Sequence, residues 1–248
     1  MSGAIPTARL DRLLANLGYS SRREIGLMAQ AGWIVLDGRT LDDVGQRVRL
    51  EPDLPERLRI KGHPLDPLPG LALMVHKPLG VTCSRKEAGP LIYDLLPPRW
   101  RRREPAISTV GRLDKDTSGL LLMTDDGDLL HRIISPRNHV AKRYQVTLAR
   151  PLVGTEADII GAGGLMLEGD EKPLLPATMT TTSPQQATLI LHEGRYHQVR
   201  RMFAALGNHV TALHRDRIGA LGLPHDLSPG QIRILTDAQR AAIFAVPE

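Results

Sequence analysis

Hydrophobic residues near the start of the chain repeat with the period of an α-helix. Four leucines between residues 10 and 17 fall at i, i+3, i+4 and i+7, so they predict a helix that Gly18 ends. Ser21 and Glu24 have the spacing of a capping box and precede further apolar positions, which predicts a second helix ending at Gly32. Two short helices joined by a tight turn are therefore expected.

A strand-like pattern follows the second helix. Residues 33–36 and 44–50 flank the turn Asp37-Gly38, so we expect them to pair as a hairpin. Residues 52–69 contain five prolines and no sustained period. The predicted organisation is a helix-helix-hairpin module over residues 1–60, a semi-rigid proline-rich linker over residues 61–70, and a larger domain over residues 71–248.

Helix and strand patterns alternate in the larger domain. Tyr144, Val146 and Leu148 alternate with polar residues, which predicts a half-buried strand. The apolar stripe between Val199 and Leu206 predicts a helix. Strands are expected over residues 71–75, 120–123 and 141–149, a further helix over 127–134, and a connecting helix and strands over 151–191.

The composition is that of a globular protein, with 42% hydrophobic and 24% charged residues among 248. Residues 95–150 hold 11 Lys/Arg against 6 Asp/Glu and residues 192–217 hold 5 against 2, whereas residues 151–191 hold 1 against 5. Two basic segments bordering one cleft would attract a polyanion, although a solvated basic face would have the same composition. The single cysteine, Cys83, leaves no intrachain disulfide, and no apolar run approaches the ~18 residues of a membrane span. We expect a cytoplasmic protein.

The densest candidate chemistry lies in residues 111–127, GRLDKDTSGLLLMTDDG. Two glycines bracket a polar loop containing Arg112, Asp114 and Asp116, and a short apolar run follows that suits a buried strand. Such a loop would hold a carboxylate and cations at the edge of a rigid sheet. An Asp between glycines is also commonly a turn residue that bonds to backbone amides. The residues alone leave both interpretations open.

The pattern GRLDxxTSGLLLMTxDG resembles the signature loop of the RsuA/RluA group of pseudouridine synthases. The resemblance implies that Asp114 is the catalytic carboxylate and that Arg112 helps to expel the target base from the RNA. HKPLG is similar to the group's KPxG motif, which places Lys77 among the expected substrate-binding residues. KRY matches its K-x-Y element, which implies that Tyr144 packs against the flipped base and is a candidate proton-transfer group.

A third motif lies near the C-terminal end. EGRYHQVRRMF resembles the group's GRxHQxR/K pattern, whose final basic residue forms a salt bridge with the catalytic Asp, and this residue is Arg200. Helical pitch places Arg200 on the flank of the buried stripe, from which it can reach a cleft. Arg195 of the same motif is expected to bind substrate. This branch often has Lys in place of Arg200, and the two cations differ in geometry.

Residues 7–50 resemble the S4 RNA-binding module. The resemblance implies RNA contacts from four arginines, Arg9, Arg12, Arg22 and Arg23. The last two lie in the first turn of the second predicted helix, where the helix dipole disfavours cations, so their position favours anion binding. Arginine stems that cover a small core are the alternative. The implied fold class is α+β, with the S4-like module followed by a mostly antiparallel mixed-sheet synthase domain with flanking helices.

Other chemistries find no support in the motifs. His192-Glu193 and His197 are one residue too far apart for HExxH. The sequence has no P-loop, no G-x-S-x-G elbow and no CxxC. We therefore expect catalysis without a metal or an organic cofactor.

The resemblance implies site-specific isomerisation of uridine to pseudouridine in ribosomal RNA. ISPRNHVAKRYQVTL is most similar to the RsuA branch, which modifies small-subunit (16S) RNA, while branches acting on large-subunit (23S) RNA share the same modules. A non-catalytic S4-type RNA-binding protein and an N-glycosylase that pairs Asp114 with Asp116 as acid and base also stay open. The expected partner is ribosomal RNA or an assembling small-subunit particle, with no membrane, and the expected state is a monomer.

Overall fold

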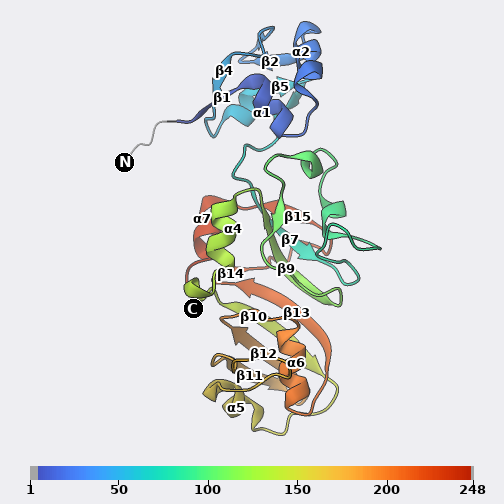
Figure 1. Cartoon of the computed structure of the whole chain (residues 1–248), viewed down its shortest axis with the longest axis vertical. Helices are drawn as coiled ribbons and strands as arrows, with labels where there is room; N and C mark the ends of the chain where they lie inside the picture. The colour runs from blue at the N-terminus through green and yellow to red at the C-terminus, as the bar shows by residue number, and fades with distance from the viewer. Residues whose placement is uncertain (1–4, 247–248) are drawn as a thin grey trace. The chain divides into compact units, whose positions relative to one another are not determined.

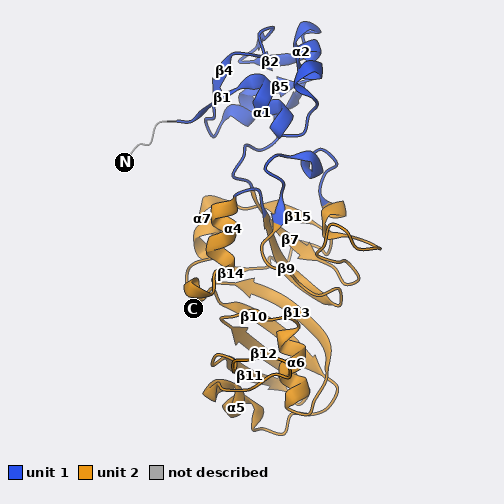
Figure 2. Ribbon diagram, viewed as in Figure 1, with its two compact units in different colours: residues 1–71, 96–108, 124–126 blue, residues 72–95, 109–123, 127–248 orange. Residues whose placement is uncertain are grey.

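The computed structural model describes residues 5–246 and divides them into two compact units (Figure 1; Figure 2). Unit 1 contains residues 5–71 together with the segments 96–108 and 124–126, and unit 2 contains the remainder. The first four residues of the predicted N-terminal module and the last two of the predicted catalytic domain lie outside the described residues.

Unit 1 is built from short helices and two small sheets. Its elements up to residue 64 are β1 (Thr7–Arg9), α1 (Leu10–Asn16), α2 (Arg22–Gln30), β2 (Ile34–Leu36), β3 (Arg39–Thr40), β4 (Arg47–Arg49), α3 (Leu54–Arg57), β5 (Leu58–Ile60) and β6 (His63–Pro64). All four leucines of the α1 stripe are buried, as predicted. Ser21 and Glu24 form both hydrogen bonds of the capping box, which confirms the predicted start of α2.

Strand pairing in unit 1 differs from the predicted hairpin. β2 pairs with β3 through the expected turn, but β4 pairs with β1, and β5 is the second neighbour of β2. From chain order we expected residues 44–50 to pair with β2. In the structure the chain continues past these residues to β5, which pairs with β2 and buries Leu58 and Ile60 in the core of unit 1. Pro64 occupies the edge strand β6, where a missing N–H breaks no ladder. The predicted linker over residues 61–70 therefore begins inside this sheet.

A buried ion pair joins the distant segments of unit 1. Nη2 of Arg103 lies 2.8 Å from Oδ2 of Asp125, and both side chains are 1% exposed. The guanidinium also donates to the carbonyl oxygens of Pro67 and Leu68, and Oδ1 of Asp125 accepts from the amide of Gly70. The polar atoms around the pair are thus hydrogen-bonded, as a buried charge requires.

Unit 2 is organised around a mixed sheet with helices beside it. Its elements are β7 (Ala72–Lys77), β8 (Ser108–Thr109), β9 (Thr117–Thr124), α4 (Gly127–Ile134), β10 (Lys142–Leu148), α5 (Glu156–Ala162), β11 (Thr178–Ser183), β12 (Gln186–Leu191), α6 (Gln198–Ala205), β13 (Val210–Ile218), β14 (Leu221–Gly222), β15 (Ile232–Ile234) and α7 (Asp237–Ala242). Unit 2 also contains 3₁₀ helices at Ile92–Leu95 and Pro136–Asn138, and a further one at Trp100–Arg102 belongs to unit 1. The predicted strands and helices of this domain are all present.

The strand order of the large sheet is β11-β12-β10-β13-β9-β7-β15, with β14 beside β13 and β8 beside β9. β13 pairs with β9 in parallel, and its pairs with β10 and β14 are antiparallel, as are those of β12 with β10 and β11 and of β15 with β7. Leu129 and Ile133 of α4 pack in one core cluster with Ile243, just after α7. The predicted α+β class with a mostly antiparallel mixed sheet is confirmed.

β9 and β13 approach each other closely at Gly119. This residue lies opposite Arg215 in the register and has φ +113°. A Cβ here would lie 2.1 Å from the carbonyl oxygen of Arg215, so only glycine fits. The close approach brings the polar loop before β9 beside the strand that carries Arg215.

No helix within residues 5–246 combines the length and the apolar character needed to cross a membrane.

Candidate active site

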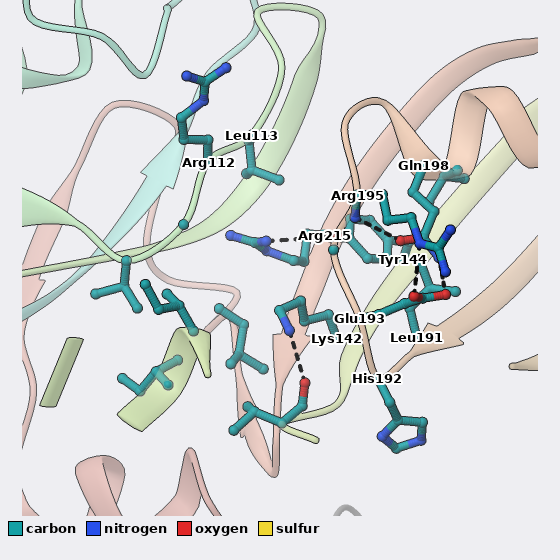
Figure 3. A pocket seen from close by; sticks show the side chains of 18 of the residues that line it. Arg112, Leu113, Lys142, Tyr144, Leu191, His192, Glu193, Arg195, Gln198 and Arg215 are labelled. Carbon is teal, nitrogen blue, oxygen red and sulfur yellow. Dashed lines mark hydrogen bonds and ion pairs between the residues drawn. The ribbon is translucent and has the colours of Figure 1, made fainter. Parts of the chain in front are cut away.

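A pocket of about 460 Å³ in unit 2 gathers four of the six site residues predicted for this unit, Arg112, Asp114, Tyr144 and Arg195. Its walls come from the loop before β9, the end of α4 and the 3₁₀ turn after it, the start of β10, residues 191–195, the start of α6, and β13 (Figure 3). The volume lies in the range of small-molecule sites. The lining includes four Lys/Arg, Arg112, Lys142, Arg195 and Arg215, and two carboxylates, Asp114 and Glu193.

Asp114 is presented to the pocket by a tight turn. Its carbonyl oxygen accepts a hydrogen bond from the amide of Thr117 at 3.0 Å, and its side chain is 28% exposed. Nε2 of His197 lies 3.4 Å from Oδ1 of Asp114. Glu193, in contrast, accepts hydrogen bonds from Arg195, Gln198 and the amide of Leu175. Among the described residues His197 is the ion-pair partner of Asp114, which is the less engaged of the two lining carboxylates and the one better placed to meet a ligand.

Lys77 supports this loop from inside the protein. Its side chain is fully buried, and Nζ donates to the carbonyl oxygens of Thr117 at 2.8 Å, Pro78 at 3.0 Å and Lys115 at 3.4 Å. Burial lowers the pKa of this ammonium. The prediction that Lys77 binds substrate is not matched by its position, because the ammonium faces backbone carbonyls and does not line the pocket.

The family motif implied that Arg200 pairs with Asp114. In the structure Arg200 pairs with Asp116 instead. Its Nη2 lies 2.8 Å from Oδ2 of Asp116 and donates to the carbonyl oxygen of the same residue, while Nη1 donates to that of Val210. Asp114 and Asp116 are two residues apart in this turn, but their carboxylates meet different neighbours, His197 and Arg200 respectively. The Arg200 side chain is 19% exposed and is not among the residues that line the pocket.

Tyr144 lies on β10 with Arg215 and Lys142 beside it (Figure 3). Nη1 of Arg215 donates to the Tyr144 hydroxyl at 3.4 Å, and Nε donates to the carbonyl oxygen of Leu120 at 2.8 Å. Nη2 of Arg215 is buried with no hydrogen-bond partner among the described residues. Nζ of Lys142 donates to the carbonyl oxygen of Val140 at 3.0 Å. Burial and the positive charge of Arg215 lower the pKa of Lys142 to about 8.

Arg112 and Arg195 line the pocket in different ways. Arg112 is exposed and makes no ion pair with any residue in the described part of the chain, and its guanidinium points away from Tyr144 in Figure 3. Arg195 donates to the carboxylates of Asp170 and Glu193 and to the carbonyl oxygens of Lys172 and Pro173. The pKa of Arg195 is raised, mainly by its hydrogen bond to Asp170. As placed, Arg195 fastens the 170–173 segment to the pocket rim, and Arg112 is free to bind an incoming group.

The four predicted RNA-contacting arginines of unit 1 are all exposed. Two of them are occupied, because Arg9 and Arg22 share the nearly buried carboxylate of Asp11 at 3.0 and 2.6 Å. The hydrogen bond from Arg9 is the largest cause that holds the pKa of Asp11 well below its usual range. Arg12 and Arg23 make no salt bridge within residues 5–246, so they are the freer pair.

Among the lining residues that the sequence prediction assigned no role are Arg215, Lys142 and His197. Arg215 lies two positions after the buried Leu213, so the alternation of a strand places its side chain on the inward face. A cation on that face needs a partner, and this was the signal in the sequence that could have identified Arg215 as a site residue. Lys142 belongs to the K-x-Y element, but only its tyrosine was assigned. His197 stacks on Tyr196 with ring centroids 3.8 Å apart, and its backbone is in the left-handed region with φ 48°. No sequence pattern predicts this conformation for a histidine.

The pocket holds the carboxylate of Asp114, a phenol, the buried cation of Arg215 and the half-buried cation of Lys142. A carboxylate in this position can act as a nucleophile or a base, and the cations can hold an anionic or carbonyl-rich ligand. Among residues 5–246, no three His, Cys, Asp or Glu side chains gather in a way that could hold a metal ion.

Comparison with known proteins gives concordant matches. A family model described as RNA pseudouridylate synthase matches residues 72–205. Ribosomal small subunit pseudouridine synthase A of Escherichia coli K12 is 38% identical over 95% of this chain and 99% of its own length. An uncharacterised RNA pseudouridine synthase, YtzG, of Bacillus subtilis 168 is 38% identical over 93% of this chain and 96% of its own length. A crystal structure of a pseudouridylate synthase matches with a TM-score of 0.66 and 33% identity, covering 95% of this chain and 99% of that one.

Proposed function

The chain belongs to the RNA pseudouridylate synthase family and is an enzyme that isomerises uridine to pseudouridine, and we propose that its substrate is a uridine of small-subunit (16S) ribosomal RNA. Support for this substrate comes from the relatives named for the ribosomal small subunit, which align along nearly the whole chain. The observation that carries the site assignment is the free carboxylate of Asp114 in one pocket with Tyr144.

The isomerisation exchanges one bond to the sugar for another. The N1–C1′ bond breaks with its electron pair on the base, the uracil turns, and C5 bonds to C1′. C5 then loses its proton and N1 gains one, so the reaction needs neither an oxidant nor an external energy source. A protein must expose the nucleotide, present a carboxylate and keep water from the detached base.

We assign these tasks to the residues of the pocket. Asp114 acts as the nucleophile or base toward the sugar or the base. Tyr144 packs against the uracil, because it lines the pocket with a ring face and a hydroxyl and is itself buried. Arg112 contacts the RNA as the target nucleotide leaves the stack, a step that costs a few kcal/mol. Arg200 acts indirectly by holding Asp116, and with it the loop, against α6.

The surroundings of Asp116 disfavour an N-glycosylase. An acid and base pair would need both carboxylates of the loop at the scissile bond. Asp116 is instead bound to Arg200 and lies outside the pocket lining. A binding protein without catalysis would not require Asp114 and Tyr144 in one cavity. A uridine of large-subunit RNA would use the same site, so the choice between the ribosomal RNAs rests on the relatives.

Unit 1 is proposed to bind the RNA outside the pocket, in the manner of an S4 domain, through Arg12 and Arg23. The full proposal is a cytoplasmic, monomeric enzyme that acts on 16S RNA or on an assembling small-subunit particle without a cofactor. Domain limits near residue 71 are part of this proposal, since β7 begins the large sheet at Ala72.

The test is pseudouridine mapping on three substrates: 16S transcript, 23S transcript and precursor small-subunit particles. Wild-type protein is expected to form pseudouridine in 16S RNA or the particle without changing the mass of the RNA. Asp114→Asn should form none while binding the RNA normally, and Asp116→Asn, in the same loop but outside the pocket, should still form product. Product only in 23S RNA would overturn the target, and loss of a base would show glycosylase action.

A further inference from the structure

The pocket has an excess of positive charge at its inner end. Of its two carboxylates, Glu193 is held by Arg195, Gln198 and the Leu175 amide, which leaves Asp114. Lys142 and Arg215 lie together in the lining (Figure 3), and neither forms a salt bridge with any carboxylate in the described part of the chain. Arg215 is buried and Lys142 is half-buried. Withdrawing two neighbouring cations from water without an acid beside them is costly.

Both cations retain unused donors. The Lys142 ammonium has three N–H groups, of which the carbonyl oxygen of Val140 takes one. Arg215 is 3% exposed, is fixed by Leu120 and Tyr144, and keeps Nη2 without a partner among residues 5–246. Burial and Arg215 also lower the pKa of Lys142, which is the sign expected when no anion is close by. The site is electrostatically incomplete on its own.

The proposed function supplies an anion that would complete it. When the N1–C1′ bond breaks with its electron pair on N1, uracil leaves as an anion whose charge is shared with its carbonyl oxygens. Tyr144 is assigned to pack against the uracil, so the base would occupy the part of the pocket near Tyr144, where Lys142 and Arg215 also lie. We propose that Lys142, steered by the adjacent charge of Arg215, binds the negative charge of the detached uracil.

This role differs from binding the substrate. Before bond cleavage the uracil is neutral, so a cation gains most when charge develops on the base. Interactions that strengthen in the transition state accelerate the chemical step, whereas uniform binding does not. Preorganised donors in a site that excludes water are the efficient form of such stabilisation. Lys142 is thereby a further catalytic residue, and Arg215 a positioning residue that fixes Tyr144 and keeps the ammonium at the base.

The test compares Lys142→Met, which keeps the stem and removes the charge, with Lys142→Arg, which keeps the charge. Single-turnover formation of pseudouridine in the RNA substrate of the wild type is expected to fall about 100-fold in Lys142→Met and to recover largely in Lys142→Arg. RNA affinity should change little in both. Lys86→Met, an exposed lysine of unit 2 outside the pocket, serves as the matched control and should behave as wild type.

A leaving-group series separates this role from a structural one. RNA with 5-fluorouridine at the target position gives a base whose anion is stabilised by the fluorine, so consumption of the target nucleotide should be slowed less by Lys142→Met than with uridine. Thermal unfolding of Lys142→Met should occur no earlier than for wild type, because a half-buried charge without a carboxylate partner has been removed.

Several outcomes would overturn the inference. These are a wild-type rate in Lys142→Met, an equal loss in both variants, an equal deficit with uridine and 5-fluorouridine, or a loss explained by weaker RNA binding. The inference rests on the proposed function, but the two fail differently. A wild-type protein that forms no pseudouridine refutes the function, whereas an active wild type with an unaffected Lys142→Met refutes only the role of Lys142.

Discussion

Replacing Gly119 with alanine should damage both the stability and the activity of the protein. The new Cβ would lie 2.1 Å from the carbonyl oxygen of Arg215, about 0.9 Å inside the 3.0 Å limit that real Cβ contacts respect. The φ of +113° is also outside the regions that L-residues populate. Backbone strain of about 1–3 kcal/mol and overpacking of about 1–3 kcal/mol give an expected loss of roughly 2–6 kcal/mol in the free energy of unfolding.

The activity of Gly119→Ala should fall further than its stability alone requires. Relief of the clash must separate β9 from β13, which moves Asp114 relative to Arg215. A displacement near 1 Å in an active site costs on the order of 100-fold in rate. Urea unfolding and single-turnover kinetics on the same preparation, at a temperature where the variant is folded, measure the two effects.

Gly127→Ala is the matched control in unit 2. A Cβ at Gly127 meets nothing within 4 Å and the residue begins α4, so alanine should stabilise the protein by about 0.5–1 kcal/mol. If Gly119→Ala unfolds within about 0.5 kcal/mol of wild type and keeps its rate, the close approach of β9 and β13 does not hold in solution.

Three further predictions concern charge. Asp125→Asn should lower the unfolding free energy by about 3–5 kcal/mol in urea titrations, because it leaves the Arg103 guanidinium buried without its carboxylate. Arg12→Gln with Arg23→Gln should weaken RNA binding and reduce its logarithmic salt dependence by about one per residue, with little change in the saturated single-turnover rate. The rate should fall as pH rises through about 8, where Lys142 loses its proton, and Lys142→Arg should move this limb to higher pH.

Each of these three predictions has a control variant and a result that would contradict it. Asp226→Asn removes an exposed ion pair with Arg233 and should lower the free energy of unfolding by less than about 1 kcal/mol. An equally small effect of Asp125→Asn would show that the buried pair with Arg103 does not stabilise the protein as proposed. Arg233→Gln should leave the salt slope unchanged, and a slope unaffected by the double variant would remove unit 1 from the RNA contact. An unmoved alkaline limb in Lys142→Arg would assign it to another group of the pocket.

Protonation of Lys142 also links pH to stability. Its folded-state pKa of about 8 lies below the ordinary 10.5, so between these values the unfolded chain binds more protons. The contribution of this group to the unfolding free energy therefore rises as pH increases from about 8 to 10.5, and it is unfavourable below that window.

Local patterns predicted the fold where the deciding interactions are local. The capping box of Ser21 and Glu24 and the leucine stripe of α1 need only neighbours in sequence, and both are present. The partner of β2 is a long-range choice, and chain order suggested β4 where the structure has β5. Proline content suggested a linker, although Pro64 fits an edge strand as well as a loop.

The site shows the same division. Motif resemblance brought Asp114 and Tyr144 to one pocket, but it could not decide which carboxylate of the loop meets Arg200. That choice depends on the turn closed by the hydrogen bond from the Thr117 amide to the Asp114 carbonyl oxygen, which leaves Asp114 beside His197 and Asp116 beside Arg200. Arg215 was not assigned because a cation on a strand is ordinarily interpreted as an outward residue, although its spacing from Leu213 places it on the inward face, where the structure buries it.

The ammonium of Lys77 occupies the place that a dehydrated metal ion fills in many oxygen-lined loops. Three backbone carbonyls converge on it, two of them from Lys115 and Thr117 of the loop, so the protein itself supplies the cation that these carbonyls face, covalently attached to β7. Its shape then needs no dissolved salt and no bound RNA to form. Chelators should leave the loop intact, and an arriving nucleotide should meet a carboxylate already in place, without waiting for the segment to order.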